Sequence, residues 1–385
     1  MQTPHRSSDA PNQVSPSPDW LWQHAGWPAL TWREDVVAPA LAAARQAQSR
    51  VLGMTAVLDG TLSAEAMADI LIEDSVTTSA IEGERLPVDA VRSSVARHLG
   101  LPHAGLPVPD RSVEGLTQLL LDATRHYAAP LTPERLYGWQ AALFPSGYSG
   151  LQRIRTAELR GDAPMQVISG GAGRERTHFT APPREGLDAQ LDNFLAWFAA
   201  APYMDGLVRA GLAHLWFVTL HPFEDGNGRL TRAITDMAIA QDEQQPMRLF
   251  SLSAQLLRER EAYYTMLERT QRGGLDVTDW LVWFLQQLQL AADAAGQTIA
   301  RTLAKARFWL RHAQVPLNER QRKVLNRLLD AGPDRFEGGI TTRKYVSLTR
   351  SSRATAFREL SDLVDKGCLQ PLDGRGRSAG YEIVW

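Results

Sequence analysis

The sequence has only one cysteine, Cys368, among its 385 residues. A single cysteine excludes an internal disulfide framework and a cluster of thiolate metal ligands, and it fits a reducing compartment. The opening residues, MQTPHRSSDAPNQVSPSPD, lack the apolar stretch of a signal peptide, and no run of about 18 apolar residues could span a membrane. We therefore expect a cytoplasmic protein without a membrane partner, and a disordered tail over residues 1–18.

An excess of charge is also missing. The 41 basic and 43 acidic residues give a formal net charge of -2, so no global field attracts nucleic acid or an anionic membrane. Any such binding has to be local. Hydrophobic residues make up 44% of the chain, which is enough for the two or three domains expected at this length.

Alanine- and leucine-rich stretches of helical character follow a tryptophan-rich opening that starts at Trp20. The pattern predicts a mainly α fold with a helical domain over 19–110, a central domain over 111–300 and a third domain over 301–385. In the first domain, Ser63 is the expected N-cap of a helix that stops at Glu82-Gly83.

The central domain is predicted to contain two helices over 112–144 and a buried helix over LVRAGLAHLWFVTL. Between them, MQVISGGAGRERTHFTAPP reads as a β-hairpin inserted into helical surroundings. In the third domain, NERQRKVLNRLLDAG and SSRATAFRELSDLVDKG predict helices, and CLQPLDGRGRSAGYEIVW predicts two strands around a turn. This order resembles a winged-helix module.

The string HPFEDGNGRLTR, from His221 to Arg232, predicts a loop that leads into the N-terminus of a helix. Gly226 and Gly228 allow the backbone amides to converge, and the positive end of the helix dipole adds to them, which together make an anion site. Arg229 and Arg232 are three residues apart on one helical face, so both guanidinium groups can reach one polyphosphate.

Two side chains of the same string point to catalysis. Asp225 offers a hard oxygen ligand of the kind that holds Mg²⁺ together with phosphate oxygens. His221 can accept a proton near neutral pH, which makes it a candidate general base. Asp-Gly-Asn-Gly alone is an ordinary turn, but a turn does not explain the whole string. The spacing excludes a Walker-type loop and an EF-hand loop.

The same string resembles the signature of the Fic family, HxFx(D/E)GNGRxxR, at every specified position. The resemblance implies that His221 deprotonates a target Ser, Thr or Tyr hydroxyl, which attacks the α-phosphate of ATP, while Asp225 holds Mg²⁺. It further implies that Asn227 and the amides around Gly226 and Gly228 stabilise the α-phosphate, and that Arg229 and Arg232 bind the β- and γ-phosphates. Doc-like phosphorylating relatives carry lysine in place of Gly228, so the glycine favours AMP transfer.

Two further segments resemble parts of this family's nucleotide and target site. The predicted hairpin resembles the family's flap, which aligns the target by strand addition and closes over the nucleotide; a plain surface hairpin is the alternative. The residues implied there are Thr177, His178, Phe179 and Thr180. The segment YYTMLERTQRG resembles the adenine side of the pocket, with Gln271 at the polar position.

The stretch Thr78-Ser79-Ala80-Ile81-Glu82-Gly83 resembles the family's inhibitory motif, (S/T)xxxE(G/N). The resemblance implies that Glu82 pairs with Arg232 and leaves ATP in a pose unsuited to in-line attack. The tryptophan-rich opening resembles the N-terminal helical domain of one bacterial group of Fic proteins. Relatives also suggest a homodimer, and the modified protein could be this chain itself.

Other functions remain open at this point. Residues 317–385 carry 13 basic and 9 acidic side chains, with Arg350, Arg353 and Arg358 near a candidate recognition helix and Arg375 and Arg377 in the expected wing. This pattern allows a DNA-binding regulator, although winged helices also dock proteins. A Fic enzyme that mainly removes AMP, or one that uses another nucleotide, is a further alternative.

Overall fold

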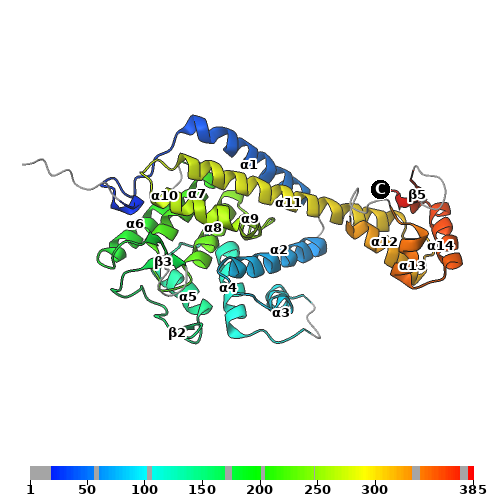
Figure 1. The fold of residues 1–385 in the computed structure, drawn as a ribbon, viewed down its shortest axis with the longest axis horizontal. Coiled ribbons are helices and arrows are strands. Elements are labelled where there is room, and N and C mark those ends of the chain that lie inside the picture. Colours follow the sequence, from blue (N-terminus) through cyan, green and yellow to red (C-terminus); the bar gives the residue numbers. More distant parts are fainter. Residues whose placement is uncertain are drawn as a thin grey trace, which may run out of the picture. The chain divides into compact units, whose positions relative to one another are not determined.

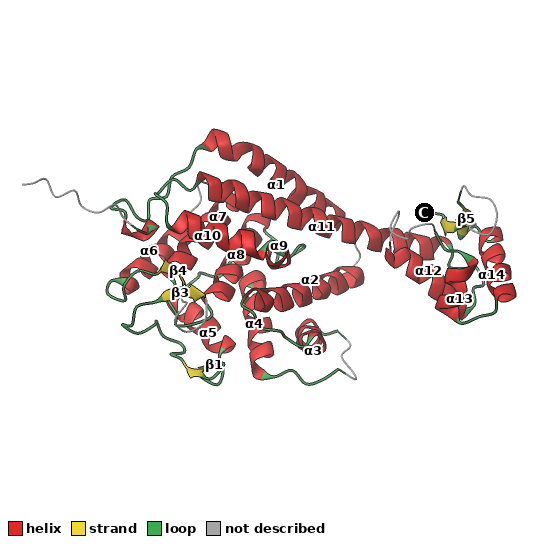
Figure 2. Ribbon diagram, viewed as in Figure 1, coloured by secondary structure: helices red, strands yellow, loops and turns green. Residues whose placement is uncertain are grey.

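The computed structural model describes residues 19–55, 60–101, 106–169, 176–200, 204–246, 248–331, 339–372 and 380–385. Helices make up most of this part of the chain, and short antiparallel hairpins supply its strands, which confirms the mainly α prediction (Figures 1 and 2). Two compact units are present, one formed by Met1–Ala47 with Ala64–Ala291 and the other by Gln48–Ser63 with Ala292–Trp385. The predicted tail over 1–18 lies outside the described residues. So do the hairpin tip over 170–175 and the segment with Arg375 and Arg377.

The first unit opens with a short 3-10 helix, Leu21–Gln23. The next five helices follow it in the chain, and their bounds are α1 Glu34–Thr55, α2 Gly60–Ile81, α3 Val88–Leu99, α4 Arg111–Arg125 and α5 Pro133–Leu143. The end of α1 and the start of α2 fall in the second unit. Helix α2 begins at Gly60, so the prediction of Ser63 as its N-cap is wrong. It ends at Ile81, and Gly83 follows with a φ of 85°.

The central helices build the core on which the motif rests. Their bounds are α6 Leu187–Ala200, α7 Gly206–Leu220, α8 Asn227–Glu243, α9 Leu252–Arg258, α10 Arg260–Gln271 and α11 Thr278–Arg311. Helix α7 is apolar around nearly its whole circumference and is buried from Leu207 onward, as predicted. Its Gly211 packs closely on α11, because a Cβ there would lie 2.9 Å from the Phe284 ring. The rigid α7–α8 pair therefore fixes the loop between the two helices.

Two hairpins belong to the first unit. Strands β1 Tyr148–Ser149 and β2 Gln152–Arg153 form a minimal one, and β3 Gln166–Ser169 pairs with β4 Arg176–Thr180 in the predicted hairpin. Phe179 of β4 is buried and meets Trp20 edge to face at 5.3 Å. The tryptophan-rich opening therefore packs against the flap-like hairpin.

The second unit contains its own hydrophobic core, which includes Val324, Tyr345 and Leu360. Its elements after α11 are α12 Glu319–Ala331, α13 Thr342–Thr349, α14 Arg353–Asp365, β5 Leu369–Pro371 and β6 Tyr381–Ile383. The predicted helices and strands are present, whereas α13 was not predicted. An isolated bridge joins Ile340 to Tyr381 beside the β5–β6 pair. The winged-helix assignment stays a prediction. No helix within the described ranges has both the length and the hydropathy needed to cross a bilayer.

Candidate active site

The loop between α7 and α8 begins with an unusual backbone conformation. His221 ends α7 with φ 48° and ψ 55°, in the left-handed region that residues other than glycine rarely adopt. The buried guanidinium of Arg160 holds it there, since Nε donates to the His221 carbonyl at 2.9 Å. The Arg160 backbone N–H also donates to the Pro222 carbonyl at 3.0 Å. Arg160 could not be recognised as part of the site from the sequence, because it lies 61 residues before His221.

The His221 imidazole is held as a neutral base. Its Nδ1 lies 3.1 Å from the Val218 carbonyl, which can only accept, so Nδ1 carries the proton and Nε2 keeps the lone pair. Burial lowers the pKa of His221, and the charges of Glu82 and Asp225 offset this only in part. A ring with a lowered pKa is neutral at pH 7 and able to accept a proton.

The Asn227 side chain holds the loop from Phe223 to Gly226 in place through hydrogen bonds to the Phe223 backbone. Its Oδ1 accepts from the Phe223 backbone N–H at 2.9 Å, and its Nδ2 donates to the Phe223 carbonyl at 2.8 Å. Gly226 caps α8 with φ 89°, and a Cβ there would lie 3.0 Å from the Phe144 ring. The first backbone N–H groups of α8 have no intrahelical acceptor and can therefore donate to an anion, but the anion site itself stays a prediction.

Arg229 contacts a carboxylate that the sequence analysis missed. Its Nη1 donates to Glu84 Oε2 at 2.9 Å, and its guanidinium lies 5.0 Å from the centroid of the Phe144 ring. Arg229 is buried, and its Nε has no partner within the described part of the chain. An orphaned buried donor of this kind fits a phosphate oxygen as its acceptor.

Arg232 is held by the end of α2. Its side chain is 2% exposed, and Nη2 donates to Glu82 Oε1 at 2.7 Å. Thr78 contributes both its hydroxyl, at 2.6 Å from Nε, and its carbonyl, at 2.9 Å from Nη2. Helix α10 anchors this end of α2, since Arg260 Nε donates to the Ile81 carbonyl at 2.8 Å.

Gly228 lies directly under the Glu82 carboxylate. A Cβ at position 228 would be 2.1 Å from Glu82 Oε1, far inside any tolerated contact. An alanine at this position would therefore require the Glu82 carboxylate to shift.

Asp225 retains capacity to bind a cation. Its carboxylate accepts from the Ser149 hydroxyl and, at 2.5 Å, from the Gly226 N–H. Two oxygens offer about four lone pairs, so some remain. No group of three or more His, Cys, Asp or Glu side chains suited to a metal occurs among the described residues. A Mg²⁺ ion at Asp225 would therefore take most of its ligands from phosphate and water, as this ion usually does.

The flap-like hairpin is held from two sides. Glu268 of α10 accepts from Arg176 at 2.8 Å and lies 2.7 Å from His178 Nδ1. Arg272 donates to the Thr177 carbonyl at 3.1 Å, and Trp22 Nε1 donates to the Thr180 carbonyl at 2.8 Å. These contacts engage β4 on α10 and on the tryptophan-rich opening. Phe179 packs against Trp20, and the nucleotide roles of all four flap residues stay predictions.

Gln271 is buried at the end of α10. Its Nε2 lies 3.3 Å from the Thr219 hydroxyl of α7. Thr219 is two residues before His221, so α10 is packed close to the base. The predicted adenine contact of Gln271 stays a prediction.

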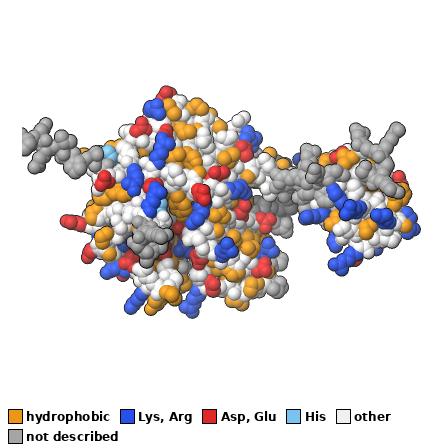
Figure 3. All heavy atoms as spheres, viewed as in Figure 1, with side chains coloured by type: hydrophobic (Ala, Val, Ile, Leu, Met, Phe, Trp, Pro, Cys, Tyr) orange, Lys and Arg blue, Asp and Glu red, His pale blue; other side chains and the backbone are white. Residues whose placement is uncertain are grey.

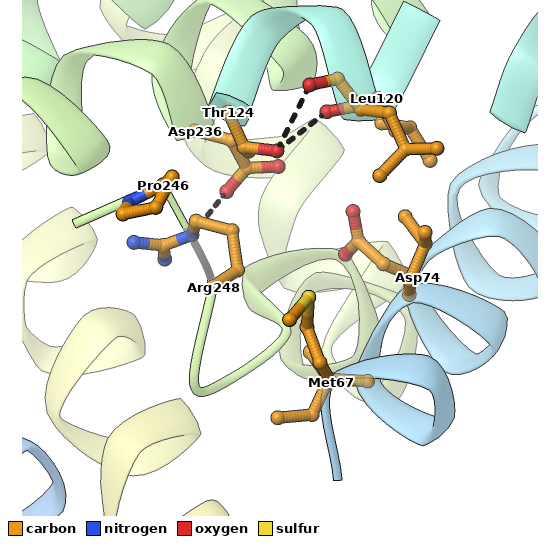
Figure 4. Close-up of a pocket in the computed structure, with 10 residues that line it drawn as sticks. Met67, Asp74, Leu120, Thr124, Asp236, Pro246 and Arg248 are labelled. Carbon is orange, nitrogen blue, oxygen red and sulfur yellow. Dashed lines mark hydrogen bonds and ion pairs between the residues drawn. The ribbon is translucent and has the colours of Figure 1, made fainter. Parts of the chain in front are cut away.

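Two acidic side chains, one from α2 and one from α8, line the same small cavity. Asp74 of α2 and Asp236 of α8 line one small cavity of about 30 Å³, which Arg248 also borders (Figure 4). Arg248 Nε donates to Asp236 Oδ1 at 3.1 Å, and the Ser251 hydroxyl donates to Asp74 at 2.5 Å. Burial, together with the Asp74 charge, raises the pKa of Asp236 to about 8, although Arg248 opposes the shift.

Comparison with known protein families finds a match for the region that contains the α7–α8 loop. The Fic/DOC family model covers residues 130–239, which include the whole α7–α8 loop and β3–β4. This part of the chain is similar to the Fic/DOC family. Ahead of that region, residues 20–101 match a domain of unknown function, DUF4172. Glu82 and Glu84 belong to this preceding domain, so the carboxylates that hold the Fic arginines come from outside the Fic match.

Solved structures share the fold. A Fic family protein from Desulfovibrio desulfuricans G20 is 16% identical, with 93% of this chain and 98% of that chain covered at a TM-score of 0.52. A Fic domain containing signaling protein from Bacteroides thetaiotaomicron VPI-5482 is also 16% identical, with 67% and 96% covered at a TM-score of 0.51. At this identity the likeness concerns the fold, and the first match extends it beyond the Fic domain.

Proposed function

We propose that this chain transfers AMP from Mg·ATP to Ser, Thr or Tyr hydroxyls of proteins. A Fic domain implies nucleotidyl transfer, and one loop supports it here. Within His221–Arg232 the chain presents a neutral imidazole, a carboxylate, a glycine-capped helix N-terminus and two buried arginines. This combination is the observation that carries the proposal.

The residues divide the chemistry between them. His221 Nε2 takes the proton of the target hydroxyl, whose oxygen forms a bond to the α-phosphorus while the bond from that phosphorus to the bridging oxygen breaks and pyrophosphate leaves. The N–H groups of α8, Arg229 and Arg232 face the developing phosphate charge. Mg²⁺ held by Asp225 supplies charge neutralisation when bound.

The resting chain is autoinhibited in this proposal. Glu82 occupies Arg232 at 2.7 Å, the guanidinium assigned to the terminal phosphates, and Gly228 makes room for it. A triphosphate bound beside Glu82 lacks that contact and is poorly aligned for attack.

The test compares the position of the label in ATP. With Mg²⁺ and a cell lysate, the Glu82→Gly variant should attach α-phosphorus label to protein more strongly than the parent chain, and γ-label should not transfer. His221→Ala in the same background should lower labelling by about 10²–10⁴-fold. Transfer of the γ-label alone would make the chain a kinase and overturn the proposal. Mass spectrometry of the labelled proteins would identify the target and show whether another nucleotide serves better.

Removal of AMP is a second candidate activity. The Glu82 side chain is 33% exposed and its charge acts on His221, so this carboxylate is placed to orient a water molecule. AMP release from a modified target should then disappear in Glu82→Ala, and its persistence would contradict this role.

A further inference from the structure

Within the described residues, four arginines of the second unit make no ion pair, whereas Arg229 and Arg232 of the first unit each do. Arg343 of α13, Arg350 between the helices, and Arg353 and Arg358 of α14 are all exposed. None of the four makes an ion pair within the described residues. Figure 3 shows Lys and Arg side chains gathered on the visible face of this unit.

The acidic side chains of α14 are engaged elsewhere. Glu359 accepts from Arg320, Asn318 and the Tyr345 hydroxyl, with the last contact at 2.6 Å. Asp362 accepts from Gln321 at 2.7 Å and pairs with Lys366. These acids therefore neutralise charges on the side of α14 that faces α12. Asp365, at the far end of the helix, is the exposed acid of α14.

The arginines lie on a helix-turn-helix. Three residues, Arg350 to Ser352, connect α13 to α14, and Arg350 adopts φ 54° to make the turn. On α14, Ala356, Leu360 and Leu363 are buried, whereas Arg353, Phe357 and Arg358 are exposed. Phe357 is 59% exposed.

The first turn of α14 is electrostatically unfavourable by itself. It contains no acidic residue and begins with Arg353, whereas the positive end of a helix dipole is stabilised by negative charge. Helix α4 also begins with an arginine, Arg111, but Asp110 caps it and Glu114 lies in its first turn. The missing counter-charge on α14 is one that a phosphate backbone would provide.

We infer that the α13–α14 face binds duplex DNA, with the N-terminal half of α14 entering the major groove. Arginines near the start of a second helix are suited to base edges and phosphates, and an exposed aromatic side chain is suited to a thymine methyl group. Arg350 in the turn and Arg343 at the start of α13 are assigned to the phosphates. The site is independent of the nucleotide site in the first unit.

The experiment uses the full chain and a labelled 30-base-pair duplex in a titration at several salt concentrations. We expect binding at about 50 mM salt that weakens steeply by about 200 mM. The double variant Arg353→Ala/Arg358→Ala should bind at least about tenfold more weakly, and the slope of log affinity against log salt should fall by about 2. This double variant and the control variant Arg111→Ala should both keep the melting temperature and the AMP labelling of the parent.

Arg111→Ala is the matched control, because it removes an exposed arginine from the first position of another helix. It should leave DNA affinity unchanged. Absence of binding at about 50 mM salt, or a double variant that binds like the parent, overturns the inference. Equally tight binding of single-stranded RNA would overturn the duplex assignment, since an unpaired strand has no major groove.

Discussion

Two pairs of arginines near helix N-termini behave in opposite ways in this chain. Arg229 and Arg232 of α8 are buried, and each donates to a carboxylate from the end of the preceding domain. Arg353 and Arg358 of α14 are exposed and make no ion pair within the described residues. A buried guanidinium needs a counter-charge at all times, whereas water solvates an exposed one.

The difference gives Glu82 and Glu84 a second role. Before a triphosphate arrives, these carboxylates supply the negative charge that the buried arginines require. The carboxylates that we propose as the brake on activity therefore also help to keep the site folded. The arginines of α14 carry no such requirement and need no internal inhibitor.

Arg232→Ala should produce the largest separation between the two pairs. It removes a buried side chain with contacts to Thr78 and Glu82, so we expect about 2–3 kcal/mol less stability in urea unfolding. In the Glu82→Gly background it should also lower AMP labelling at least about 100-fold.

Arg353→Ala is the counterpart for that measurement. An exposed arginine without a partner should change stability by less than about 0.5 kcal/mol. Equal losses in the two variants would contradict the contrast between buried and exposed pairs.

The contact between Gly228 and Glu82 offers a sharper test. Gly228→Ala adds a Cβ only 2.1 Å from the present position of Glu82 Oε1. It should push the carboxylate away from Arg232 and reduce stability by about 2 kcal/mol. In a Glu82→Gly background the collision no longer exists, so the same alanine should be nearly neutral. Unfolding curves for the four proteins give the coupling energy directly. Strict additivity would mean that the close approach does not exist in solution.

Glu82 and Glu84 should inhibit AMP transfer to different extents. Glu82 meets an arginine that is 2% exposed, while Glu84 is itself 43% exposed. Release of Glu82 by Glu82→Gly should therefore raise AMP labelling about tenfold or more, whereas Glu84→Gln should raise it no more than about fivefold, the limit for an exposed pair. The double variant should exceed both.

The thermal behaviour of these variants separates the two roles. Without nucleotide, Glu82→Gly should melt below the parent, and Mg·ATP should raise its melting temperature more than that of the parent. A variant that is already as stable as the parent without nucleotide would refute the stabilising role of Glu82.

The sequence was sufficient for features that are contiguous along the chain. His221 to Arg232 could be recognised because loop, glycines and arginines fall within one string, and the buried helix before it because its apolar pattern is complete. Glu84 and Ser149 could not be recognised, since they reach Arg229 and Asp225 across 145 and 76 residues. A single acid or serine carries no sign of its distant partner.

Local residue preferences also led to two wrong predictions of secondary structure. Helix α13 was missed because TTRKYVSLT is short and rich in β-branched and aromatic residues, which favour strands. It forms nevertheless, because Thr341 caps it and Tyr345 is buried in the core of its unit. Ser63 was a plausible cap by residue type, but the helix already begins at Gly60.

A further expected effect concerns a third kind of charge, a buried acid on the same helix as the buried arginines. Because the pKa of Asp236 is raised to about 8, the folded chain holds a proton that the unfolded chain has already lost above about pH 4. Stability should therefore fall as the pH rises toward 8, by about 1 kcal/mol per pH unit from this group.

Asp236→Asn cannot lose that proton, so its unfolding free energy should vary less between pH 6 and 8 than that of the parent. Asp279→Asn, at an exposed ion pair with Arg269, is the control and should keep the parent's slope. Parallel curves for the parent and Asp236→Asn would mean that Arg248 keeps the carboxylate ionised. In that case the charged Asp236 depends on its ion pair with Arg248. Asp236→Asn removes this pair and should then lower the stability at every pH.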